Sequence, residues 1–360
     1  MKVASRNLRL IRRTEISRET SIMISVLGVF MAFAVAGVLF LLVGVNPIAA
    51  YGAILDSFTN PILLGNTIQR ASPLLFAALG LTVVFRLNFW NVGAEGQIVM
   101  GGIAATGIVT LHLVSGAIPD LLVLPTMFLA SFFLGALYAL VPALLKAKLQ
   151  VNEILSTLML NYIAILLGNY LVFGPWLDPA AHGFPNSRIF PPEAVIPAIP
   201  VIGGSTGFLV GIVAAVGIYF LMKRTTFGFE LKVTGDSTKA AKYAGMSYTR
   251  IVSLAMAISG GLAGLGGLVL VSGIIGRMKE DFSAGYGYTS IIVAWLAGLN
   301  PLATVVAAFL FGGLLVSGTT LQVRLGLSSS TTNIFEALIL IFVLASEFLK
   351  KYRVVMGGGL

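Results

Sequence analysis

The chain has 360 residues, of which 57% are hydrophobic and 10% are charged, and its mean hydropathy is +0.97. Soluble domains carry about 25% charged residues, so this composition excludes a soluble enzyme, a disordered chain and a collagen-like fibre, and it predicts an all-α membrane protein. There is no cysteine, and His112 and His182 stand far apart, so we expect no histidine-cluster metal site and no cofactor in this chain.

Ten apolar segments are long enough, or nearly long enough, to cross a bilayer, which takes about 20 helical residues. They cover residues 22–45, 66–85, 92–112, 121–143, 153–173, 204–222, 251–273, 286–299, 302–320 and 333–349. Segment 286–299 is short, and its length also fits a re-entrant segment or a half-helix. We expect residues 22–350 to form one transmembrane domain with about ten helices.

The basic residues predict the orientation of these segments, because Lys and Arg concentrate on the cytoplasmic side of membrane proteins. With the N-terminus inside and ten crossings, 18 of the 23 basic residues fall inside. The other five are Arg70, Arg188, Arg277, Lys279 and Arg324. Without a crossing at 286–299, the basic residues after position 349 would move outside. We therefore expect both termini in the cytoplasm, and we assign the net charge of +9 to contact with anionic membrane lipid and not with nucleic acid.

Two stretches outside the predicted segments leave alternatives open. Residues 1–21 form a basic cytoplasmic segment that is either an interfacial helix on the inner leaflet or a solvated tail. The outer loop 174–203 is rich in proline, which stiffens it, and it is either a docking surface for a substrate-delivery protein or a simple connector on the helix bundle. A short cytoplasmic tail, 351–360, ends the chain as given.

The cytoplasmic loop 223–250 is predicted to contain a short capped helix. Asp236 is a good N-cap residue, 237–244 is the expected helix, and Gly245 suits its C-terminal end. A helix of this length is marginal in water, so we expect it to rest on the bundle or on a partner protein.

The side chains of this short helix favour a close contact. Ala240, Ala241 and Ala244 are small enough to permit close approach. Lys239 and Lys242 supply positive charge at the rim.

The turn between the second and third segments carries the strongest cluster of polar residues near the membrane. Asn91, Glu95 and Gln97 occur in and just before a segment otherwise built of small and apolar residues. Polar groups in hydrocarbon are costly unless they have partners or a water-filled path. Glu95 is expected to pair with Arg86 or a neighbouring helix end. It either lines a path or is a buried polar group that fixes the packing of the helices, and we prefer the second alternative.

Further candidates lie in later segments. Gly260 and Gly264 form a GxxxG face, which predicts close helix packing. Asn161, Trp295 and Asn300 are candidates to face an aqueous path.

The motifs that the chain lacks also limit its function. It has no GxxxxGK[ST] P-loop, no HExxH and no GxSxG. No segment carries several acidic residues at mid-depth, as an ion-driven carrier often does. We therefore expect a transport subunit without catalytic residues, whose energy comes from elsewhere.

Three stretches resemble the permease subunits of bacterial ABC importers, in particular the nucleoside and simple-sugar branch, which is related to the branched-chain amino acid permeases. They are LNFWNVGAEGQIVMGG (87–102), TFGFELKVTGDSTKAAKYAG (226–245) and GYGYTSIIVAWLAGLNP (285–301). The resemblance extends over nearly all of residues 60–350.

The resemblance implies a ten-helix importer permease with two inverted repeats in a bacterial cell membrane. The predicted orientation agrees with it, because segments two and seven run in opposite directions. The helix at 236–245 would be a coupling helix seated in a groove of a cytoplasmic ABC ATPase subunit, with Asp236, Lys239 and Lys242 beside the family motif. Characteristic residues of that motif fall on Gly228, Lys232, Gly235, Ala240, Ala241 and Gly245.

The same resemblance implies partners and a mechanism. A second permease chain, a shorter paralogue, would flank the same path, and an extracytoplasmic substrate-binding protein or lipoprotein would deliver substrate. ATP binding by the ATPase would move the coupling helix and drive alternating access. The preferred cargo is a nucleoside; ribose-like sugars and branched-chain amino acids are alternatives. A stand-alone secondary carrier or channel is the rival from another class, although it would have no need of a docking helix.

Overall fold

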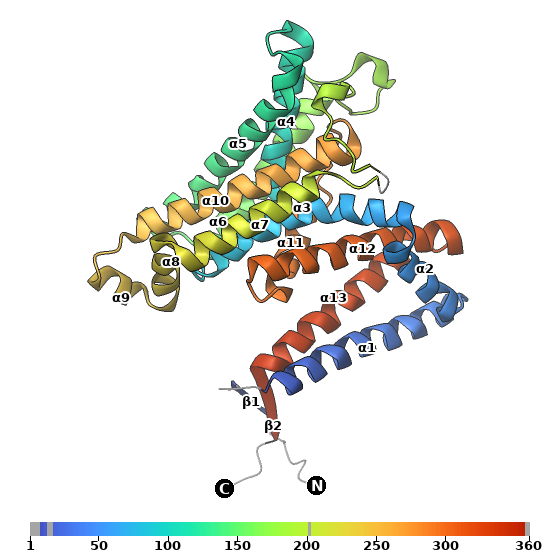
Figure 1. Ribbon diagram of the computed structural model, residues 1–360, viewed down its shortest axis with the longest axis vertical. Helices are drawn as coiled ribbons and strands as arrows, with labels where there is room; N and C mark the ends of the chain where they lie inside the picture. Colours follow the sequence, from blue (N-terminus) through green and yellow to red (C-terminus); the bar gives the residue numbers. More distant parts are fainter. Residues whose placement is uncertain (1–7, 13–16, 201–202, 357–360) are drawn as a thin grey trace, which may run out of the picture. The chain divides into compact units, whose positions relative to one another are not determined.

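The computed structural model describes residues 8–12, 17–200 and 203–356 (Figure 1). In chain order the elements are β1 (Leu8–Arg12), α1 (Arg18–Leu42), α2 (Pro47–Thr59), α3 (Pro61–Phe85), α4 (Ala94–Ser115), α5 (Asp120–Leu149), α6 (Glu153–Phe173), η1 (Pro179–Ala181), η2 (Pro192–Ala194), α7 (Gly207–Arg224), α8 (Thr226–Asp236), α9 (Thr238–Tyr243), α10 (Tyr248–Leu268), the π-helix η3 (Val269–Ile275), α11 (Tyr286–Leu296), α12 (Pro301–Leu325), α13 (Ser329–Lys351) and β2 (Tyr352–Met356). The expected helical fold class is confirmed, with two five-residue strands as the exception.

The chain divides into two compact units, and the smaller one combines Met1–Asp56 with Ser317–Leu360. In this unit α1 packs against α13, and β1 pairs with β2 in an antiparallel ribbon that places Leu10 opposite Val354. The interfacial-helix alternative for residues 1–21 is therefore wrong over β1, whereas the solvated tail stays a prediction. Its residues, LRLIR, do not alternate strictly between apolar and basic, so no local pattern marks the strand, and its backbone partner lies more than 300 positions away.

The larger unit, Ser57–Val316, is built around α10, which packs against α3, α4 and α5. Glycine makes these contacts close. A Cβ added at Gly264 would lie 2.2 Å from the carbonyl oxygen of Ser131, and one added at Gly260 would lie 2.4 Å from that of Gly135. The GxxxG prediction is thus confirmed, and its partner is α5.

Each of the ten predicted segments coincides with a helix, and apart from 153–173 their boundaries differ from those of the helix. In the part of the chain that the structure describes, seven helices are long and apolar enough to cross a membrane: α3, α4, α5, α6, α7, α10 with η3, and α12. Helix α2 lies in a stretch where the sequence predicted no segment. The number of crossings and the inverted repeats remain predictions.

The short segment at 286–299 forms an 11-residue helix, α11, as its length suggested. The chain enters α11 through three residues with left-handed backbone, Asp281, Ala284 and Gly285, at φ of 46°, 43° and 83°. This conformation stops the helix from extending towards η3. The polar groups at the start of α11 therefore need partners from elsewhere in the unit.

Candidate functional site

The first candidate site is the hairpin of α8 and α9. Thr225 caps α8 by accepting a hydrogen bond from the N–H of Gly228 at 3.2 Å. Ser237 caps α9 by accepting one from the N–H of Ala240 at 3.2 Å. The prediction that Asp236 is the N-cap is wrong by one residue, because α8 occupies the chain up to Asp236 and the following serine is the first residue free to cap.

The end of α9 is formed as predicted. Gly245 has a φ of 76°, its N–H donates to the carbonyl of Lys242, and the N–H of Met246 donates to the carbonyl of Ala241. This pair of bonds is a Schellman motif, which gives a six-residue helix a defined stop. The hairpin therefore consists of two helices with defined ends and is not an irregular loop.

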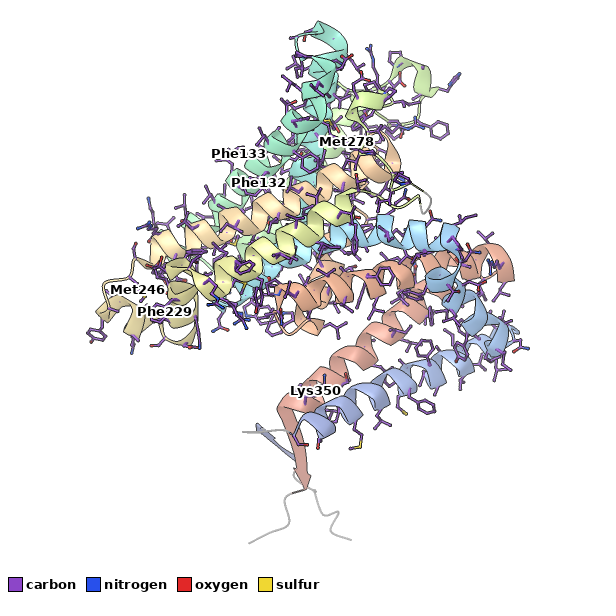
Figure 2. The ribbon with its side chains drawn as sticks, viewed as in Figure 1. Phe132, Phe133, Phe229, Met246, Met278 and Lys350 are labelled. Atoms are coloured by element: carbon purple, nitrogen blue, oxygen red, sulfur yellow. The ribbon has the colours of Figure 1, made fainter. Side chains whose placement is uncertain are left out.

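The side chains of α9 divide into a buried and an exposed set. Ala241 is 2% exposed and faces inward, so it is not available to a partner as the sequence suggested. Lys239, Ala240 and Lys242 are exposed, and Tyr243 is 93% exposed. Figure 2 shows Phe229 and Met246 at the same hairpin, and Phe229 of α8 is 62% exposed.

The hairpin is tied to the end of α3. A Cβ on Gly235 would lie 1.9 Å from the carbonyl oxygen of Arg86, so only glycine allows this contact. The side-chain amide of Asn88 donates to the carbonyl of Gly235 at 2.8 Å. Arg86 itself donates to the carbonyl of Leu299 at 3.0 Å, so one turn joins α8 to the connection between α11 and α12.

An aromatic cluster lies against this turn. Phe85, Trp90 and Trp295 have ring centroids 5.6–5.8 Å apart, and Trp295 stacks on both other rings at interplanar angles of 26°. Phe85 is buried, whereas Trp90 is 44% exposed. The rings therefore place this turn in direct contact with α3 and α11.

Glu95 is the centre of the second candidate site. Its carboxylate accepts hydrogen bonds from the hydroxyl of Ser283 at 2.6 Å, the N–H of Gly285 at 2.9 Å and the N–H of Gly287 at 2.6 Å. It does not pair with Arg86, and of the two expected partners it takes the helix end. A carboxylate at a helix N-terminus also interacts favourably with the helix dipole.

Three amide side chains extend this polar core. Asn91 and Gln97 bond to each other twice at 3.1 Å, and Asn91 also reaches the hydroxyl of Ser259 on α10. Asn161 of α6 accepts the N–H of Gly96 at 2.8 Å and donates to the hydroxyl of Tyr288 at 3.1 Å.

Glu95 and the three amide side chains are at most 2% exposed. Their hydrogen bonds join α4, α6, α10 and α11. Every one of them has hydrogen-bond partners within the chain.

The structure separates the remaining predicted residues from this core. Trp295 belongs to the aromatic cluster, and Asn300 accepts the N–H of Leu302 at 3.1 Å in the first turn of α12. Lys232 and Arg86 line a surface pocket of about 320 Å³ between α7 and α8. These residues therefore lie towards the hairpin and not towards Glu95.

A family model described as "Branched-chain amino acid transport system / permease component" matches residues 63–344. The chain belongs to this permease family. The match covers nearly all of the larger unit and extends into α13, and it confirms the expected transport subunit.

Three curated relatives of this permease are named as ABC transporter permeases. The glucose permease TsgB13 of Haloferax volcanii is 35% identical over 91% of this chain and 88% of its own length. The guanosine permease NupP of Bacillus subtilis is 30% identical, covering 95% of this chain and 97% of its own. The nucleoside permease NupB of Lactococcus lactis is 26% identical, covering 91% and 92%.

Sequence reasoning about the permease missed several residues. Tyr243 was overlooked although it is an aromatic residue in a short polar helix, which is a usable signal. Ser283 and Tyr288 were overlooked because nothing local marks them as partners of Glu95 and Asn161. Their roles depend on contacts across more than a hundred positions.

Proposed function

We propose that this permease is the membrane subunit of an ATP-driven importer, that it crosses the cell membrane ten times, and that both termini lie in the cytoplasm. The excess of basic residues on one side of the predicted segments supports this orientation. In this orientation the hairpin of α8 and α9 faces the cytoplasm.

The hairpin is the surface that docks on the ATPase subunit. The exposed lysines of α9 and the 93% exposed ring of Tyr243 support this role. An exposed aromatic side chain flanked by charged residues is typical of a protein-docking surface. ATP-driven movement of the groove would shift α8 and α9 together. Gly235 and Asn88 would pass that shift to Arg86 and to the stacked rings of α3 and α11. The result is alternating access without covalent chemistry in this chain.

The exposed face of α9 is the observation that carries this proposal, and charge reversal tests it. Lys239→Glu with Lys242→Glu, in the transporter assembled with its ATPase and delivery protein in proteoliposomes, should abolish most uptake while the permease keeps its melting temperature. A matched control reverses Lys148 and Arg224, which are also exposed and on the same predicted side. Equal uptake by the two double variants would remove the docking role.

The cargo we propose is a nucleoside. The guanosine and nucleoside permeases that align over more than nine-tenths of the chain support this choice. A simple sugar is the second candidate, because the glucose permease is 35% identical. The family description also keeps branched-chain amino acids as an alternative.

A competition experiment separates these cargoes. Uptake of labelled guanosine should be blocked by unlabelled nucleosides and unaffected by glucose, ribose or leucine. Uptake of labelled glucose or ribose, with no uptake of guanosine, would identify the sugar. Uptake by the permease alone, without an ATPase, would instead indicate a stand-alone carrier or channel.

We further propose that a shorter permease paralogue and an extracytoplasmic binding protein complete the transporter. Membership of an ABC permease family supports separate ATPase and substrate-binding partners in general. Co-purification of the tagged chain from its native membrane tests the composition, and a complex with two copies of this chain would contradict the paralogue.

A further inference from the structure

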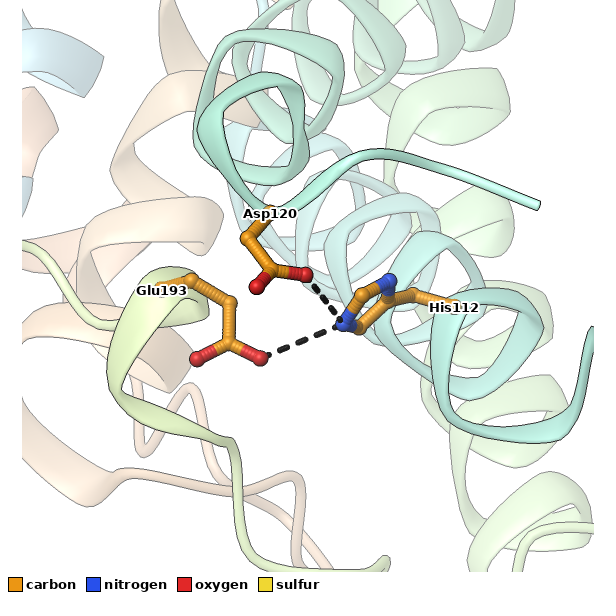
Figure 3. Close-up of side chains that lie close together, drawn as sticks. All are labelled: His112, Asp120 and Glu193. Carbon is orange, nitrogen blue, oxygen red and sulfur yellow. Dashed lines mark hydrogen bonds and ion pairs between the residues drawn. The ribbon is translucent and has the colours of Figure 1, made fainter. Parts of the chain in front are cut away.

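Three ionisable side chains from three separate elements meet away from the sites described above (Figure 3). His112 lies in the last turn of α4, Asp120 begins α5, and Glu193 lies in η2 of the proline-rich loop. The Nε2 atom of His112 is 3.2 Å from a carboxylate oxygen of Glu193 and 3.8 Å from one of Asp120. One ligand atom from each residue lies within 4.8 Å of the others.

The orientation of the His112 ring is that of a metal ligand. Its Nδ1 atom is 2.9 Å from the carbonyl oxygen of Ile118, which can only accept, so Nδ1 carries the hydrogen. In the neutral ring the lone pair of Nε2 then points at two carboxylates. Metal-bound histidines usually donate their second ring N–H to a carbonyl or carboxylate in this way, which fixes the tautomer and the ring orientation.

The two distances from the His112 ring are also close to those around a bound ion. Around tetrahedral Zn²⁺, with bonds of about 2.0–2.2 Å to nitrogen and oxygen, adjacent ligand atoms lie about 3.3–3.5 Å apart. The two observed distances from Nε2, 3.2 and 3.8 Å, fall on either side of this range. A charge-assisted hydrogen bond would be shorter, about 2.7–2.9 Å.

Neighbouring backbone and side-chain contacts hold the three proposed ligand residues in place. Gly116, at φ of 61°, ends α4 and turns the chain towards Asp120. The segment around Glu193 is fixed by the buried hydroxyl of Ser272, which donates to the carbonyl of Ala194 at 2.6 Å and accepts the N–H of Ile196 at 3.0 Å.

Charge favours the same site. Two carboxylates beside the ring nitrogen of an imidazole form a set of electron-rich donors that attracts a cation. Asp120 is four-fifths exposed, which leaves a side of the cluster open to water. One imidazole, two carboxylates and a water complete a four-coordinate site.

We propose that His112, Asp120 and Glu193 bind a divalent transition-metal ion of the zinc type, with water as the fourth ligand. The ion joins η2 to the connection between α4 and α5, and so fixes the proline-rich loop to the bundle. The distance between His112 and His182 in the sequence argues against a site with two histidines, but it does not exclude a site with one. The proposal holds whichever cargo the permease carries; only its placement on the outer face rests on the proposed topology.

Calorimetric titration with ZnCl₂ tests the site, using the full chain in detergent after removal of the affinity tag and treatment with EDTA. We expect one Zn²⁺ per chain and a rise in melting temperature. His112→Gln or Glu193→Gln should weaken zinc binding by about tenfold or more. His182→Gln is the matched control, because it changes the other, exposed histidine and should leave zinc affinity unchanged.

Other results would overturn the site. No zinc binding, binding that His112→Gln leaves intact, or equal binding of Mg²⁺ would each contradict it, since imidazole is a poor ligand for hard cations. A melting temperature that depends on pH through His112, without any effect of zinc, would show instead that protonated His112 forms ion pairs with the carboxylates. If His112→Gln fails to fold, Asp120→Asn at the exposed ligand decides the question by the same titration.

Discussion

The carboxylate of Glu95 and the backbone N–H of Gly287 lie 2.6 Å apart, although 192 positions separate them in the chain. Gly287 permits this contact, because a Cβ there would lie 2.3 Å from the backbone nitrogen of Glu95. The start of α11 is thus seated on the first turn of α4. A helix that begins inside the unit takes its N-terminal cap from another segment.

Replacing Glu95 by Gln should mainly destabilise the permease. The NH2 group of Gln replaces an accepting oxygen with a donor at a place where two N–H groups and a hydroxyl already donate, and a buried unsatisfied donor costs about 1–3 kcal/mol. Thermal unfolding in detergent, with exposed Glu280→Gln as the control, measures the effect. Lost uptake at unchanged melting temperature and expression would show that Glu95 lines the path.

Adjacent alanines of α9 should respond differently to Phe. Ala241→Phe should lower the melting temperature, because this side chain is 2% exposed and overpacking costs about 1–3 kcal/mol. Ala240→Phe should leave the melting temperature unchanged and reduce uptake, since residue 240 lies on the exposed face. The two measurements are unfolding and ATP-driven uptake. A stable Ala241→Phe variant would contradict the packing seen here.

Gly264→Ala should destabilise the larger unit, because the new Cβ would meet the Ser131 carbonyl at 2.2 Å and force α10 away from α5. Gly217→Ala is the matched control on α7, where an added Cβ meets nothing within 4 Å. Helix propensity alone favours Ala over Gly by about 1 kcal/mol, so the control should be neutral or slightly stabilising. Comparable melting temperatures for the two variants would contradict the close α5–α10 contact.

Asn88 offers a test of the connection between the hairpin and α3. Its φ is 54°, and its amide donates to Gly235. Asn88→Gly keeps the backbone without strain and removes only the hydrogen bond, so uptake per ATP hydrolysed should fall at constant melting temperature. Asn88→Ala adds a cost of about 1–2 kcal/mol for the left-handed backbone. It should therefore lower both the uptake per ATP hydrolysed and the melting temperature. Unchanged uptake in both variants would exclude Asn88 from coupling.

Much of the helical layout could be predicted because hydropathy is a local property. The segment at 153–173 coincides with α6 without any shift in its ends. The GxxxG contact and the Gly245 stop were also predictable, because close packing and left-handed backbone both favour glycine. The error at Asp236 arose because two adjacent residues can both cap, and the end of α8 selects between them.

Which partners the polar and small residues take was decided only by the tertiary structure. Sequence spacing places Glu95 near a helix end. It does not show that the backbone N–H groups of Gly285 and Gly287 donate to the carboxylate. Likewise, Ala240 and Ala241 are equivalent in composition, and only packing buries one and exposes the other. Apolar length is set by consecutive residues and the thickness of a bilayer, whereas a buried polar group is satisfied by whichever segment folding brings within about 3 Å.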